Sequence, residues 1–154
     1  MLTEKEKAEI DKYLKHYPRK DAARIEALRV VQEHRKWVSD ESIDDIAAYL
    51  EMSPEAIESV ATYYNLIFRR PVGRHVILVC DSVSCWILGY EKILEHLIKT
   101  LKVELGGTTE DDRFTLLPIA CLGTCDKAPA LMINDDLHRN LTTDKLDEIL
   151  ENYE

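Results

Sequence analysis

The first 70 residues repeat apolar side chains at the spacing of amphipathic helices. In four successive segments apolar residues recur three, four and seven positions apart, which is the period of one helix face. Residues suited to helix starts precede these segments. The expected starts are Thr3 with Glu6, Ala22, Ser42 with Asp45, and Ser53 followed by Pro54. We therefore predict a helical bundle over residues 1–70.

The pattern changes at RRPVGR, residues 69–74, where Pro71 and Gly73 interrupt the helical spacing. The segment HVILVC at 75–80 is a continuous apolar run, typical of a strand buried on both faces. The elements expected after it are a helix around Ile93–Leu101, the strands RFTLLPI and ALMI, a short strand at HRNL, and a last helix from Thr142 or Thr143. This order predicts a small α/β domain over residues 74–154, whose first two strands are joined by a crossover helix.

The chain has four cysteines, and they form two close pairs at the ends of predicted strands. Cys80 closes HVILVC and is followed by Cys85, while Cys121 and Cys125 follow RFTLLPIA. If the two strands are neighbours in one sheet, both pairs emerge at its carboxyl edge, where open α/β sheets collect ligands. We therefore expect the four sulfurs to converge.

Charge is distributed unevenly along the chain. Residues 1–73 carry 12 Lys and Arg against 14 Asp and Glu, whereas residues 74–154 carry 8 against 15, a net charge of −7. The cysteine-bearing part is therefore acidic, which disfavours nucleic acid as a partner because phosphate binding depends on basic side chains. The sequence shows neither a targeting segment nor an apolar run of the roughly 20 residues that span a bilayer. A reducing compartment is expected, where disulfides are the poorer interpretation of the cysteines.

Four convergent thiols in a reducing compartment permit three kinds of site. Structural zinc takes four thiolates, but its cysteine pairs usually have two residues between them, whereas here the gaps are four and three. A thiol–disulfide oxidoreductase would carry C-x-x-C, which neither pair has. A [2Fe–2S] cluster takes four thiolates whose sulfurs accept hydrogen bonds from loop amides, such as those of DSVS and LGT. The spacing favours the cluster and leaves zinc open.

Three stretches of sequence together resemble a known family. CDSVSC at 80–85, CLGTCDKAP at 121–129 and SVATYYNLIFRRPVGRH at 59–75 resemble the small thioredoxin-like [2Fe–2S] subunit of the NADH-input module of respiratory complex I. The resemblance runs over nearly the whole chain. It implies an α/β protein in which an N-terminal helical bundle is followed by a thioredoxin-like [2Fe–2S] ferredoxin domain with one cluster. The cluster ligands that it implies are Cys80, Cys85, Cys121 and Cys125.

The resemblance also implies a partner, a larger subunit that carries FMN and the NADH site. This chain shows no G-x-G-x-x-G motif and no Walker loop of its own. We therefore expect an electron relay that exchanges single electrons with the FMN of the partner in NADH:quinone oxidoreductase and is not catalytic alone. Its expected place is the cytoplasmic side of a bacterial inner membrane, as a peripheral part of the complex without membrane insertion. Equivalent subunits serve NAD-linked hydrogenases and formate dehydrogenases; the alternative of another class is a zinc-held structural interaction module.

Two histidines and one lysine in the second part of the chain lie near the predicted site in the sequence. His75 and His138 flank strands and could replace two cysteines in a Rieske-type site, but four cysteines already fill the ligand count, so we expect packing or surface roles.

The acidic surroundings of the cysteines predict a low reduction potential for the cluster. Loop amides and Lys127 would oppose this effect, since hydrogen bonds and positive charge near sulfur raise the potential.

Overall fold

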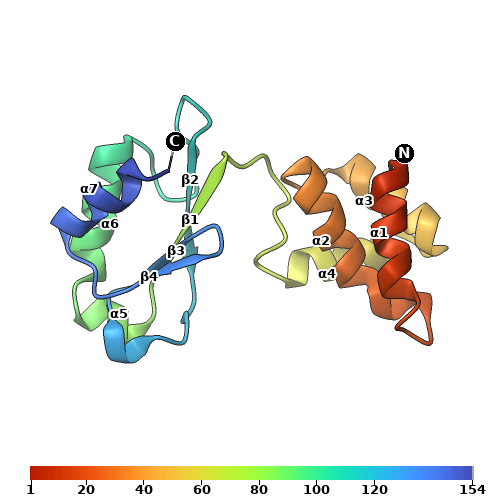
Figure 1. Ribbon diagram of the computed structural model, residues 1–154, viewed down its shortest axis with the longest axis horizontal. Coiled ribbons are helices and arrows are strands. Elements are labelled where there is room, and N and C mark those ends of the chain that lie inside the picture. Colours follow the sequence, from red (N-terminus) through yellow and green to blue (C-terminus); the bar gives the residue numbers. More distant parts are fainter. Residues whose placement is uncertain (154) are drawn as a thin grey trace. The chain divides into compact units, whose positions relative to one another are not determined.

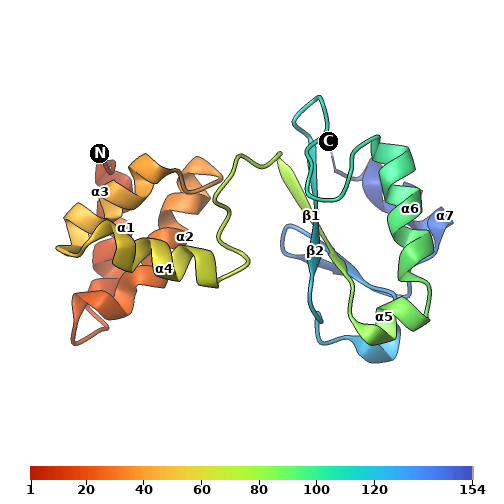
Figure 2. The same cartoon turned by 180° about the vertical axis from the view of Figure 1, so that it is seen from behind.

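A computed structural model of the chain describes residues 1–153. The chain divides into two compact units, Met1–Pro71 and Val72–Glu154. The first unit is helical, and the second combines a four-stranded sheet with helices (Figures 1 and 2). Each unit has a hydrophobic core of its own. No helix within residues 1–153 combines the length and the apolar character that a membrane crossing would require.

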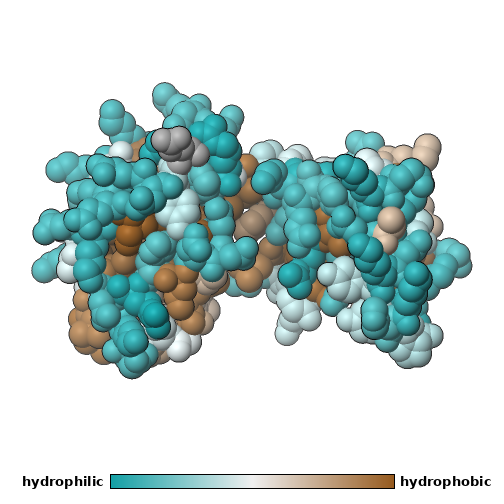
Figure 3. Space-filling model, in the orientation of Figure 1, coloured by the Kyte–Doolittle hydropathy of each residue, from teal (hydrophilic) through white to brown (hydrophobic). Residues whose placement is uncertain are grey.

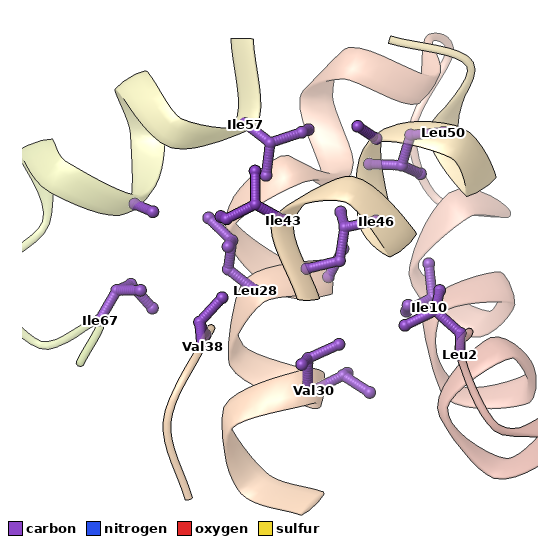
Figure 4. Close-up of a cluster of buried hydrophobic side chains, with 14 residues drawn as sticks. Leu2, Ile10, Leu28, Val30, Val38, Ile43, Ile46, Leu50, Ile57 and Ile67 are labelled. Atoms are coloured by element: carbon purple, nitrogen blue, oxygen red, sulfur yellow. The ribbon is translucent and has the colours of Figure 1, made fainter. Parts of the chain in front are cut away.

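The first unit is a bundle of four α-helices and one 3₁₀ turn. Its elements are α1 (Glu4–Leu14), η1 (Lys20–Ala23), α2 (Arg24–Arg35), α3 (Asp40–Leu50) and α4 (Pro54–Tyr63). Aliphatic side chains from all four α-helices meet in its core (Figure 4). Ile10, Leu28, Ile46 and Ile57 have no exposed surface, one from each helix. The apolar spacing in the sequence therefore predicted these four inward positions correctly, whereas Tyr13 and Tyr64, which belong to the same spacing, are 43 and 46% exposed.

Capping side chains explain where two of these helices begin. At α1 the Glu6 N–H donates to Thr3 Oγ1 over 3.3 Å, and the Thr3 N–H donates to Glu6 Oε2 over 2.6 Å, which is the predicted capping box. At α4 the Ser53 hydroxyl accepts a hydrogen bond from the Ala56 N–H. Both caps could be predicted from the sequence because the capping residue and its hydrogen-bond partner lie three residues apart.

The predicted start of the third helix at Ser42 is wrong. Helix α3 begins at Asp40, and its N-cap is Ser39, whose hydroxyl accepts a hydrogen bond from the Ser42 N–H over 3.2 Å. Ser42 is buried, and its hydroxyl accepts a hydrogen bond from Arg35 Nη1 over 3.1 Å. Ser39 therefore caps the helix, because the hydrogen bond from Arg35 holds Ser42 inside it.

The sheet of the second unit has the strand order β2-β1-β3-β4. The strands are β1 (His75–Cys80), β2 (Phe114–Ile119), β3 (Leu131–Ile133) and β4 (Asp136–His138). Strand β1 is parallel to β2 and antiparallel to β3, and its register pairs Cys80 with Ile119. The two strands that precede the cysteine pairs are therefore neighbours and end side by side, as predicted.

The fourth strand begins before HRNL, where it was predicted, and shares only His138 with that segment. It runs over Asp136–His138 and pairs antiparallel with β3. Asn134, at a φ of 53°, and the next residue form a two-residue hairpin turn between them. The tight turn leaves Asp136 in the strand, whereas the sequence pattern places that residue in the turn.

The helices of the second unit are α5 (Val83–Ile87), α6 (Tyr90–Leu101) and α7 (Thr143–Glu151), and a 3₁₀ turn, η2, spans Cys125–Lys127. Helix α6 is the predicted crossover between β1 and β2. Helices α6 and α7 cover the same face of the sheet (Figures 1 and 2). There Leu97 and Leu146 pack with Ile77 and Leu116 in a core without exposed surface.

Candidate metal centre

The four cysteines lie at the carboxyl ends of β1 and β2, as the sequence predicted. Cys80 is the last residue of β1, and Cys121 comes two residues after β2. Backbone hydrogen bonds hold this edge together: the Cys80 N–H donates to the Ala130 carbonyl over 3.2 Å, and the Asp81 N–H donates to the Ile119 carbonyl over 3.1 Å. Parallel pairing thus brings the two cysteine-bearing segments to one edge of the sheet.

The first cysteine pair is buried. Cys85 lies on α5, which begins at Val83, so the predicted DSVS loop is wrong in its second half. Cys80 and Cys85 are each 2% exposed and pack with Ala130. The Cys85 thiol shares a hydrogen bond with Cys80 and accepts one from the Ala130 N–H. Burial raises the pKa of the Cys85 thiol to about 11, so a metal that binds here must displace its proton.

The second cysteine pair is exposed. The Sγ atoms of Cys121 and Cys125 are 3.2 Å apart, and the Gly123 N–H donates to Cys121 Sγ over 3.3 Å. Gly123 has a φ of 76°, a conformation that glycine adopts without steric cost. The hydrogen bond with Cys125 lowers the pKa of the Cys121 thiol, helped by the Gly123 N–H, and the same bond raises the pKa of Cys125. In this pair negative charge is therefore favoured on the Cys121 sulfur, while the Cys125 thiol keeps its proton more readily.

Cys125 connects the two pairs. Its pKa is raised first by Cys121 and further by the charge of Cys80, and the charge of Cys125 in turn raises the pKa of Cys85. The Ser84 hydroxyl, on α5, donates a hydrogen bond to Cys125 Sγ. Among the His, Cys, Asp and Glu residues of 1–153, no group of three or more is arranged to hold a metal ion. The expected convergence of all four sulfurs is therefore not seen in the described residues; the sulfurs lie as two pairs at one edge of the sheet.

The donor set fits a cluster of two irons, because a [2Fe–2S] cluster takes four thiolates, two for each iron. The chain offers two free thiols from each of two segments. The main-chain N–H groups of Gly123 and Ala130 already donate to cysteine sulfurs. Such hydrogen bonds stabilise negative charge on the ligands of a cluster.

The structure shows two donors that sequence reasoning missed, Ser84 and Ala130. Ser84 directly precedes a cysteine, so its hydroxyl could have been proposed from the sequence. Ala130 is 45 positions from Cys85 in the chain and reaches it only because β3 pairs with β1. That contact depends on the fold and leaves no local signal.

The two histidines have packing roles, as expected. Their rings lie 5.3 Å (His75) and 6.1 Å (His138) from the ring of Tyr153. His75 Nδ1 is 3.0 Å from Asn134 Nδ2, and His138 Nε2 is 3.0 Å from the Tyr153 hydroxyl. Burial lowers the pKa of His138. These contacts place both side chains in the packing between the sheet and the C-terminal segment.

Comparison with known proteins identifies a family and similar proteins in two bacteria. The family described as "Thioredoxin-like [2Fe-2S] ferredoxin" matches residues 10–154. The E subunit of NADH-quinone oxidoreductase from Buchnera aphidicola is 49% identical over 152 residues, which cover 99% of this chain and 94% of that protein. The protein of the same name from Pseudomonas aeruginosa is 49% identical over 153 residues, covering 99% and 92%.

A solved structure extends the likeness to three dimensions. An NAD⁺-reducing [NiFe]-hydrogenase in its air-oxidized state resembles this chain with a TM-score of 0.71 and 25% sequence identity. The likeness covers 82% of this chain but only 22% of the hydrogenase chain. The family match includes the whole sheet and all four cysteines, and the two bacterial relatives match along nearly their full length. This chain therefore belongs to the thioredoxin-like [2Fe–2S] ferredoxin family.

Proposed function

We propose that this chain is the [2Fe–2S] electron-transfer subunit of an NADH-quinone oxidoreductase, the counterpart of the E subunit in its relatives. One observation carries the proposal: two cysteine pairs lie at the carboxyl ends of the neighbouring strands β1 and β2 in a chain 49% identical to such an E subunit over 99% of its length. The cofactor of the family is one [2Fe–2S] cluster. Its proposed ligands are Cys80, Cys85, Cys121 and Cys125.

The residues of the site suit a relay. When bound, the cluster holds and returns one electron at a time. The thiolates supply the ligands, and the donors on Ser84, Gly123 and Ala130 stabilise the negative charge that reduction adds to the sulfurs. The net charge of −7 over residues 74–154 acts against that charge and keeps the potential low. The site offers thiols, main-chain N–H groups and one hydroxyl, which stabilise negative charge on a bound cluster. The oxidation of NADH therefore requires a partner subunit.

The proposed partner is a subunit that carries FMN and binds NADH, with which this chain exchanges single electrons. The names of the relatives support an NADH-linked complex, and the hydrogenase neighbour supports an NAD-linked one. The exposed Cys121 and Cys125 leave one side of the site open to such a partner. We place the chain on the cytoplasmic side of a bacterial membrane, as a peripheral part of the complex.

The hydrogenase likeness favours a second host, an NAD-reducing hydrogenase in which this chain would be the equivalent part. The identity to the E subunit of the quinone-linked complex is 49%, against 25% to the hydrogenase, so the quinone-linked complex is the better-supported host. Purification of the native complex through a tag on this chain separates the two. We expect quinone-reducing subunits to copurify; a nickel–iron subunit in their place would transfer the proposal to the hydrogenase.

The cluster itself is tested on anaerobically purified protein by absorption, metal and sulfide analysis, and EPR after dithionite reduction. We expect a red-brown protein with two irons and two sulfides per chain and a spin-one-half signal when reduced. The Cys85→Ser and Cys121→Ser variants should lose or strongly alter that signal. Colourless protein with one zinc per chain, still colourless after treatment with iron and sulfide, would overturn the proposal and support the zinc-held module.

A further inference from the structure

Helix α5 and the residue after it expose a set of large apolar side chains. Val83, Trp86, Ile87 and Leu88 are 66, 57, 69 and 57% exposed. Apolar residues gather at the end of the second unit (Figure 3), where Figure 1 places α5. We call these four residues the α5 patch. Contiguous exposed apolar side chains in a soluble protein mark an interaction surface more often than scattered ones do.

The α5 patch shares its helix with the candidate metal centre. Cys85, at 2% exposure, occupies the inner side of α5, and Ser84 of the same helix donates to Cys125 Sγ. A protein that covers the patch therefore comes within about 10–12 Å of the sulfurs, which is the diameter of one helix. Electron exchange weakens steeply with distance, so a docking surface at this position serves the transfer directly.

The chemistry of the patch restricts its occupant. Residues 82–90 carry no charged side chain, so a partner can cover them without desolvating an ion. Tryptophan is among the residues enriched in interface hot spots. The exposed charged residues beside the patch and beside η2 are Asp81, Glu91, Lys92, Asp126 and Lys127, a net of −1 within a part of the chain at −7. A complementary surface has an apolar centre and a basic rim.

We propose that the α5 patch is the docking surface for the flavin-carrying subunit with which this chain exchanges electrons. The inference rests on the proposed function and adds the surface at which that function takes place. The occupant is an apolar region with basic residues at its rim, on the flavin subunit near its FMN. Val83, Trp86, Ile87 and Leu88 form the centre of the interface, and the net charge of −7 over residues 74–154 steers the approach of a basic partner surface.

The test measures the affinity of the full-length, cluster-loaded chain for the FMN-containing, NADH-binding subunit of the same organism. The variants are Ile87→Glu and Val83→Glu, which change exposed side chains and leave the residues next to the cysteines in place. The matched control is Leu105→Glu: Leu105 is 37% exposed but follows the far end of α6, whose 12 residues place it about 18 Å along the helix from α5. EPR spectra and iron content verify that each variant carries an intact cluster.

We expect Ile87→Glu and Val83→Glu to weaken binding at least tenfold and Leu105→Glu to change it less than twofold. Rising salt should weaken the wild-type affinity, because the rim contacts are electrostatic. The inference is overturned if both patch variants, with unaltered EPR spectra, bind like the wild type, or if the control weakens binding equally. It is also overturned if Ile87→Glu only converts a dimer of this chain to a monomer, since a second copy is then the occupant.

Failure of the proposed function gives a different result. In that case the wild-type chain itself carries no cluster, or carries one and shows no measurable affinity for the flavin subunit. If the wild type binds and the patch variants bind equally well, the electron-transfer function stands and only the docking surface is wrong.

Discussion

Hydrogen-bond donors around the sulfurs determine how readily the site accepts negative charge, and they differ in kind. Gly123 and Ala130 donate main-chain N–H groups, which remain when a side chain is changed. Ser84 donates a side-chain hydroxyl to Cys125 Sγ. Ser84 is therefore the donor that mutation removes without touching a proposed ligand or the backbone.

Replacing Ser84 with alanine is expected to lower the reduction potential of the cluster. Removing a hydrogen bond to sulfur destabilises the more negative, reduced state. A net hydrogen bond is worth about 1 kcal/mol, and a one-electron couple moves about 59 mV for each 1.4 kcal/mol, so the shift is on the order of tens of millivolts. An EPR-monitored redox titration measures it. Ser82→Ala is the control, since the Ser82 side chain makes no capping bond to α5; an equal shift in both variants would contradict the role of Ser84.

At the residue scale the sequence predicted the cysteines and an amide donor in the LGT loop, found at Gly123, but not the burial of the first pair. Cys80, Cys85, Cys121 and Cys125 stood out because their spacing is local and each pair follows a predicted strand. Their division into a buried and an exposed pair could not be predicted, because it depends on α5 and on the packing of Ala130 from the segment before β3. Burial is a property of the assembled sheet edge, and no local pattern encodes it.

At the scale of elements, one buried ion pair joins the first two helices of the bundle. Glu6 of α1 is 1% exposed, and its carboxylate oxygens accept hydrogen bonds from Arg35 Nε over 2.7 Å and from Nη2 over 2.9 Å. Arg35 of α2 also reaches Asp45 of α3 over 3.4 Å. Hydrogen bonds from Arg35 are the largest cause that lowers the pKa of Glu6 to about 2. A bidentate pair of this kind fixes the register of α1 against α2.

Glu6→Gln is expected to destabilise the chain by about 2–3 kcal/mol at pH 7, because it leaves the Arg35 charge without its main partner. In the unfolded chain Glu6 titrates near 4.5, so its depressed pKa contributes stability that is complete above that pH and is lost as pH falls toward about 2. Urea unfolding followed by circular dichroism at pH 7 and pH 3 measures both effects. Glu4→Gln is the control, since Glu4 pairs with Lys7 on an exposed surface. A Glu6→Gln variant with wild-type stability at pH 7 would refute the role of the pair.

A second contact between elements holds the C-terminal segment on the sheet. The Tyr153 hydroxyl donates to Asp136 Oδ2 over 2.8 Å and lies 3.0 Å from His138 Nε2, and both partners belong to β4. Burial, with help from Asp136, raises the pKa of Tyr153 to about 12, so the hydroxyl keeps its proton. Tyr153→Phe should therefore cost about 1–2 kcal/mol at pH 7.5. Tyr63→Phe, at a residue 81% exposed, should cost nothing measurable in the same urea titration.

The burial of His138 in the same contact predicts how the stability of the chain changes with pH. Burial lowers the pKa of His138, so the unfolded chain takes up a proton more readily than the folded one. Stability should fall as pH drops below about 6.5, where the unfolded histidine titrates. A His138→Gln variant should show a smaller fall in unfolding free energy between pH 7.5 and pH 5.5 than the wild type. An equal or larger fall would assign that dependence to other groups.

Elements with a clear apolar pattern were predictable from the sequence. Helices of ten or more residues showed a clear apolar period, and β1 showed a continuous apolar run. The five-residue α5 is too short to show a helical period, so the sequence pattern predicts a loop at its start. The start of α3 was misplaced because two serines three positions apart both suit a cap, and only the Arg35 contact to Ser42 decides between them.

At the scale of the whole molecule, the proposed chemistry lies in one of the two units. All four cysteines and the donors Ser84, Gly123 and Ala130 belong to Val72–Glu154. That unit also has its own core, formed between the sheet and α6 and α7. Met1–Pro71 contributes a separate core and a bundle closed by its own caps and ion pair. The division suggests that cluster binding and the folding of the bundle are separable.

A chain limited to residues 72–154 is therefore expected to take up the same cluster as the full protein. Its sheet register, its cysteines and its sulfur donors all form within the unit, so none depends on residues 1–71. Reconstitution with iron and sulfide should give two of each per chain and the EPR spectrum of the full protein. Residues 1–71, treated alike, should stay colourless and helical. A 72–154 chain that folds by circular dichroism yet binds no cluster, while the full chain does, would show that the bundle is needed to complete the site.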